Sequence, residues 1–199
     1  MGLNDYRYRV PLSLKTLELF KMGYNLAIGE AEVDWSEDMV RIDVVTVSLD
    51  DAPAFGEPTD HMNVRWPSYS TWSNFCRKIG IEDAVLNRRN GGEGELELPD
   101  GTFIGCLMPS HPGVAPVTRK HLTFIEAKVA EYKAKHPDHI AQFPKPKPDA
   151  KPIHGTGVYL DEDYDDDPRN DGDLCRAEWL LFWLRWAVEN CKKPVFFNS

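Results

Sequence analysis

One stretch near the C-terminus, residues 174–191, limits the possible folds of this chain more than any other. Read as a helix, "LCRAEWLLFWLRWAVENC" is apolar around most of its circumference. A helix that is apolar on nearly all sides is buried. We therefore expect it to pack back on the core of its own chain or to join two copies of the chain. The apolar positions are Leu174, Ala177, Trp179, Leu180, Leu181, Phe182, Trp183, Leu184, Trp186, Ala187, Val188 and Cys191.

The rest of the chain can supply a core for such a helix. It has 199 residues, of which 42% are hydrophobic, enough for one substantial core. We predict a single compact α+β domain. Its core covers 1–136, a Pro/Lys-rich strap covers 137–158, and 159–199 adds an acidic loop and the buried helix to the same domain.

Two β-hairpins are expected in the core. The strand patterns "AEVDW" and "MVRIDVVTVSL" flank the turn "SED", and "ELEL" and "TFIGCLM" flank the strong turn signal "PDG". A short strand, "HMNVRW", is expected between the hairpins.

Several short helices are expected as well. One begins near Ser13, one spans 70–80 and ends at Gly80, and a shorter one covers 82–89. A longer helix follows Thr118 as its N-cap and ends at His136-Pro137. After it, four prolines between 144 and 152 favour an extended strap.

Charge is unevenly distributed along the chain. The net charge is −9, and the acidic segment 161–173 alone carries eight carboxylates and one arginine, a formal charge of −7. The preceding stretch 119–151 has a formal charge of +4. Such an uneven charge distribution affects which partners a protein attracts. We expect the acidic segment to contact a protein partner, a basic one, through Asp161, Glu162, Asp163, Asp165, Asp166 and Asp167.

The acidic segment also permits a calcium-binding interpretation. With Gly172 as the obligatory glycine of an EF-hand loop, Asp167, Asp171 and Glu178 take ligand positions. Arg169 opposes this, because it occupies a position that needs an oxygen ligand. In the simpler interpretation Asp171 or Asp173 caps the helix. No other cofactor is expected.

A helix-turn-helix is a further alternative for 72–89. Cys76, Gly80 and Leu86 have the required spacing, and the hairpin at 95–107 could serve as a wing. Phosphate contacts would come from Arg77, Lys78, Arg88 and Arg89. The net charge of −9 disfavours a nucleic-acid partner.

No sequence motif identifies an active site. Ser110 and His111 are neighbours in sequence, which does not place the hydroxyl on the imidazole. His136 and His139 have the spacing of one ligand pair, but no second compact pair completes a zinc site.

These observations favour a non-enzymatic interaction protein or an inhibitor-type accessory protein, similar to those of phages and mobile elements. The alternatives are a DNA-binding protein with a winged helix-turn-helix at 72–107, and a metal-dependent enzyme centred on 161–178. The C-terminal helix could form a homo-oligomer. We expect a cytoplasmic protein with reduced cysteines and no membrane partner, because a secretory signal, an apolar span and C-x-x-C spacing are missing.

Overall fold

The computed structural model describes residues 23–35, 40–86, 95–151, 164–165 and 167–199. Within these ranges the fold is α+β, as predicted. The strands are β1 (Leu26–Trp35), β2 (Val40–Val44), β3 (Val64–Arg65), β4 (Leu96–Glu97), β5 (Phe103–Ile104), β6 (Gly113–Pro116) and β7 (Pro194–Asn198). The helices are α1 (Tyr69–Ile79), α2 (Glu82–Val85), α3 (Arg119–Lys135) and α4 (Gly172–Asn190).

The main sheet has the strand order β2-β1-β7-β6, and β3 pairs with the start of β1. All its pairings are antiparallel, and the fully buried Phe196 of β7 lies opposite Ile28 on one side and Ala115 on the other. The sequence analysis did not predict β6 or β7. Both are runs of four or five residues that contain proline, too short for a periodic pattern to be distinguished.

The first predicted hairpin is confirmed, but β2 is shorter than expected. Regular strand pairing ends after Val44, because the buried side chain of Asn63 forms hydrogen bonds with the backbone of Val45 and Val47. Asn63 donates to the carbonyls of Ile28 and Val45, each at 2.8 Å, and accepts from the N–H of Val47 at 2.8 Å. The second predicted hairpin is the β4–β5 pair.

The predicted helix at 70–80 is confirmed as α1. The hydroxyl of Ser68 accepts from the backbone N–H of Thr71, which caps its N-terminus. Gly80 ends it in the left-handed conformation at φ 80°, where glycine carries no Cβ penalty.

The helix predicted after Thr118 is α3. Thr118 and His121 form a capping box in which His121 accepts from the N–H of Thr118 at 3.2 Å. The other ring nitrogen of His121 donates to the carbonyl of Gly105 at 2.7 Å. Burial lowers the pKa of His121, although the bond to Gly105 opposes the shift. This histidine is therefore a neutral structural residue.

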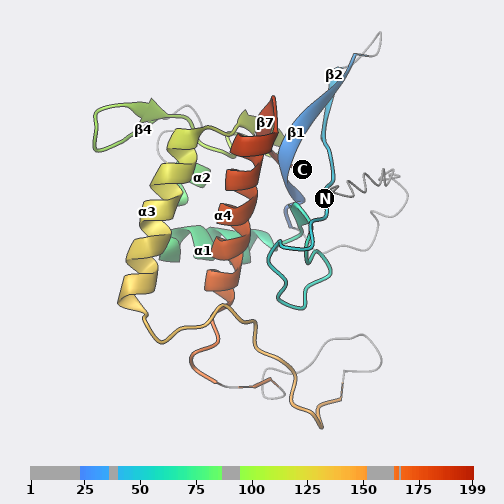
Figure 1. Ribbon diagram of the computed structural model, residues 1–199, viewed down its shortest axis with the longest axis vertical. Coiled ribbons are helices and arrows are strands. Elements are labelled where there is room, and N and C mark those ends of the chain that lie inside the picture. Colours follow the sequence, from blue (N-terminus) through green and yellow to red (C-terminus); the bar gives the residue numbers. More distant parts are fainter. Residues whose placement is uncertain (1–22, 36–39, 87–94, 152–163, 166) are drawn as a thin grey trace, which may run out of the picture.

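The aromatic C-terminal helix, α4, packs on the core of its own chain, as the apolar pattern predicted. It lies between α3 and β1, and α1 runs across it (Figure 1). Trp179, Leu180, Trp183 and Leu184 are fully buried there, together with Trp72, Phe75 and Phe196 from α1 and β7. The fully buried face of α4 is thus covered by its own chain.

Three expected features fall outside the described residues. They are the helix near Ser13, the turn at 36–38 and the end of the helix at 82–89, of which the structure describes α2.

Candidate functional site

A polar junction forms where the acidic segment enters α4. Asp171 is the N-cap of this helix, and its Oδ1 accepts from the backbone N–H groups of Asp173 at 2.9 Å and Leu174 at 3.0 Å. The capping interpretation of the acidic segment is therefore confirmed for Asp171. The residue is 7% exposed, so the junction is largely shielded from water.

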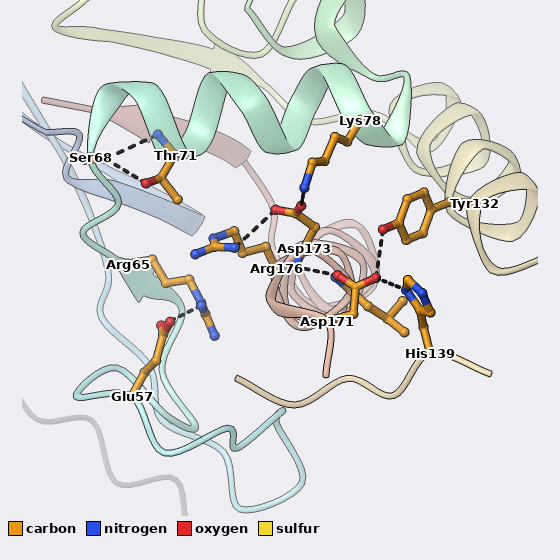
Figure 2. A network of polar contacts seen from close by, with 11 residues as sticks. Glu57, Arg65, Ser68, Thr71, Lys78, Tyr132, His139, Asp171, Asp173 and Arg176 are labelled. Carbon is orange, nitrogen blue, oxygen red and sulfur yellow. Dashed lines mark hydrogen bonds and ion pairs between the residues drawn. The ribbon is translucent and has the colours of Figure 1, made fainter. Parts of the chain in front are cut away.

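The second carboxylate oxygen of Asp171 joins two further parts of the chain. Oδ2 accepts from the hydroxyl of Tyr132 on α3 and from Nδ1 of His139 in the strap, both at 2.7 Å (Figure 2). Burial alone raises the pKa of Asp171, but the hydrogen bonds from His139, Tyr132 and the two backbone N–H groups outweigh burial and lower it. Burial and the bond to Asp171 also raise the pKa of Tyr132.

The described residues of the strap (137–151) and of the acidic segment (164–165 and 167–173) lie alongside each other, and we call the strap and the acidic segment together the arm. Ile140 donates its N–H to the carbonyl of Arg169 at 2.8 Å and accepts from the N–H of Asp171 at 3.0 Å. Further out, Pro146 bridges to Tyr164, and Asp165 donates its N–H to the carbonyl of Lys145 at 2.7 Å. The described parts of the arm lie beyond the adjacent ends of α3 and α4 (Figure 1).

The aromatic ring of Phe143 docks the strap beside the start of α4. It lies 5.0 Å from the guanidinium of Arg176 and 5.9 Å from that of Arg65. A Cβ on Gly172 would be 2.9 Å from this ring, so the absence of a side chain there makes room for Phe143.

Arg65 is a buried cation next to this contact. It forms an ion pair of 2.5 Å with Glu57 (Figure 2) and lies 5.3 Å from the ring of Trp179. Its Nε and Nη2 have no hydrogen-bond partner among the described residues. The rings of Trp179, Phe55 and Phe143 lie 5.3–6.0 Å from the guanidinium, within the range of cation–π attraction. Burial lowers the pKa of Arg65, and Glu57 opposes this. This cluster could not be predicted from the sequence, because Phe143 and Trp179 are far from Arg65 in the chain.

Of the six acidic residues expected to contact a partner, Asp165 and Asp167 are described. Asp161, Glu162, Asp163 and Asp166 lie outside the described residues. Asp165 is exposed. Asp167 accepts hydrogen bonds from the guanidinium of Arg169 at 3.0 and 2.7 Å and from its backbone N–H at 3.0 Å, and these bonds lower the pKa of Asp167 to about 2.

The three residues of the calcium interpretation each have a different partner. Asp167 binds Arg169, Asp171 caps α4, and Glu178 forms an ion pair of 3.0 Å with Lys133. In the part of the chain that the structure describes, no three His, Cys, Asp or Glu side chains form a group that could hold a metal ion.

The described basic residues of the DNA-binding alternative also have separate acidic partners. Arg77 lies 3.5 Å from Glu82, and Lys78 forms an ion pair of 2.8 Å with Asp173 (Figure 2). Arg88 and Arg89 lie outside the described residues. The second helix of the motif, α2, has four residues, and it buries Ala84 and Val85 in the core. This geometry does not favour a recognition helix in a DNA groove.

Comparisons of the chain with protein-family models, curated proteins and solved structures found no match. None of the helices in the described ranges is long and apolar enough to cross a membrane.

Proposed function

We propose that this protein binds a basic protein partner through the acidic segment of its arm. The observation that carries this proposal is the junction at Asp171, which joins the acidic segment to α3, α4 and the strap. The C-terminal end of a segment of formal charge −7 is thereby held at a fixed place on the fold.

The neighbouring contacts support this assignment. Asp171 caps the helix, Arg169 pairs with Asp167, and Lys78 and Arg176 pair with Asp173, but these three cations cannot neutralise eight carboxylates. Clustered charge of one sign attracts a partner of the opposite sign and accelerates association. A basic patch on another protein is the matching surface.

Binding of the full chain to a decalysine peptide tests the proposal. In the arm variant, Asp165, Asp166 and Asp167 are all replaced by Asn. The matched control replaces Glu95 and Glu97 by Gln and Asp100 by Asn, which removes the same charge near the β4–β5 hairpin.

At roughly 50 mM salt the arm variant should bind decalysine about fivefold to tenfold more weakly than the unmodified protein, and the difference should shrink at high salt. The hairpin variant should lose less than about twofold. Equal losses in the two variants would show that only total charge matters, and the proposal would then fail.

A further inference from the structure

A second polar cluster lies where α1 meets β7, and it does not involve the arm. Nε2 of His111 is 2.8 Å from the hydroxyl of Tyr69, and Nδ1 of His111 is 2.9 Å from Oδ1 of Asn198. Tyr69 is in the first turn of α1, whereas Asn198 is the last residue of β7 and is fully buried. The fold thus brings three distant positions of the sequence together around one imidazole.

The hydrogen bonds define the direction of proton donation. The Nδ2 group of Asn198 donates to the carbonyl of Gly113 at 3.3 Å, so its Oδ1 faces His111 as an acceptor. Nδ1 of His111 must therefore carry the proton. Nε2 is then the basic nitrogen of the neutral ring, and it accepts from the hydroxyl of Tyr69.

A cavity of about 220 Å³ adjoins this cluster. His111 and Tyr24 line it, and the ring of Tyr69 packs against both, with centroids 5.3 Å and 4.6 Å away. The other lining residues are Ser73, Leu86, Met108, Pro109 and Ser110. None of these residues carries a full charge, apart from a histidine that can be protonated, so an uncharged molecule suits the cavity better than an ion.

Ser110 is next to His111 in sequence, but its hydroxyl is hydrogen-bonded to a backbone carbonyl and not to the imidazole. Its Oγ donates to the carbonyl of Pro112 at 2.9 Å, and the two imidazole nitrogens are bonded to Tyr69 and Asn198. The hydroxyl that the imidazole can deprotonate is therefore that of Tyr69.

We propose that Tyr69, His111 and Asn198 act as nucleophile, general base and positioning residue in acyl transfer from an uncharged carboxylic ester. In nucleophilic catalysis the nucleophile is hydrogen-bonded to a general base, and a third group orients that base. His111 is exposed and Tyr69 is partly exposed, so an ester can reach the hydroxyl.

The bond changes of this step balance. Oη of Tyr69 attacks the acyl carbon while Nε2 of His111 takes the phenolic proton. The bond between the acyl carbon and the leaving oxygen then breaks, and the proton passes from His111 to that oxygen. Tyr69 is left as an acyl ester, which water can hydrolyse with His111 again as the base.

Reaction of the full chain with p-nitrophenyl acetate tests this proposal. We expect a burst of about one equivalent of p-nitrophenolate and an acetyl group on Tyr69, located by peptide mass spectrometry. His111→Gln should slow the burst about a hundredfold or more, the usual contribution of a general base. Tyr69→Phe should abolish it, and melting curves of both variants should show that they are folded.

Tyr132 is the matched control, because its hydroxyl is hydrogen-bonded to a carboxylate instead of an imidazole. Tyr132 should remain unacetylated in the unmodified protein while Tyr69 is acetylated. That comparison needs no variant, so it holds even if a substitution at Tyr69 disturbs folding. Equal acetylation of Tyr69 and Tyr132, a burst that survives in Tyr69→Phe, or acetylation at Ser110 instead would each overturn the proposal.

Discussion

Replacing Asp171 with Ala should destabilise the whole fold, because one carboxylate links α3, α4 and the strap. Losing the N-cap costs about 1 kcal/mol. Hydrogen bonds to charged groups contribute roughly 1.5–3 kcal/mol each, but His139 is partly exposed and water can replace its partner, so about 1 kcal/mol is expected for each of the two bonds. The free energy of unfolding should therefore fall by about 3 kcal/mol.

Urea denaturation, monitored by tryptophan fluorescence, measures this loss of stability, because Trp179 and Trp183 of α4 are buried. For a chain of this length the melting temperature should fall by roughly 6–12 °C. Asp171→Asn should lose less, since its Oδ1 can still cap the helix. Asp167→Asn removes a partly exposed carboxylate of the same segment, whose partner Arg169 lies two residues away, and should leave the melting temperature nearly unchanged. If Asp171→Ala melts at the same temperature as Asp167→Asn, the contacts of Asp171 with α3, α4 and the strap do not stabilise the fold.

The same junction predicts a pH dependence. Folding lowers the pKa of Asp171, so its contribution to stability is complete above the ordinary carboxyl pKa of about 4 and is lost as the pH falls through the lower value of the folded state. Asp171→Asn should therefore lose less stability than the unmodified protein as the pH falls below about 4. Parallel acid titrations of the two proteins would contradict this.

Three further predictions concern packing. Truncation before Leu174 removes most of α4 and the central strand β7, so the fragment should be insoluble or melt without cooperativity; a soluble fragment with a sharp transition in calorimetry would refute this. Gly172→Ala should destabilise the protein by roughly 1–3 kcal/mol in urea titrations, because its Cβ meets the ring of Phe143, yet in a Phe143→Ala background it should be neutral or stabilising. The same cost in both backgrounds would exclude that contact. Burial raises the pKa of Cys175 to about 12 and of Cys191 to about 11, so both should react slowly with Ellman's reagent at pH 8 and rapidly in urea, and fast labelling of Cys175 in the folded protein would contradict its burial.

The sequence predicted the elements that carry their own local signals. The apolar circumference of 174–191, the glycine at position 80 and the threonine at position 118 each specify a helix or one of its ends, and all three are confirmed. The turn "PDG" likewise predicted the β4–β5 hairpin.

The remaining features depend on contacts between distant residues. β7 is central in the sheet because Phe196 pairs with strands 80 or more positions away, and five residues carry no periodic signal of that kind. The clusters at Asp171, Arg65 and His111 also join residues from separate elements. For Asp171 the sequence indicated the cap, but nothing near it indicated Tyr132 or His139 as partners.

Amide hydrogen–deuterium exchange of the full chain, with and without decalysine, is the most direct test of binding through the arm, because it locates the contact without any substitution. We predict slower exchange in the acidic segment, including the N–H of Asp165, and in the adjoining strap, including the N–H of Ile140, with no change in the β4–β5 hairpin. Unchanged exchange in the acidic segment when decalysine is bound, or equal protection of the hairpin, would contradict it.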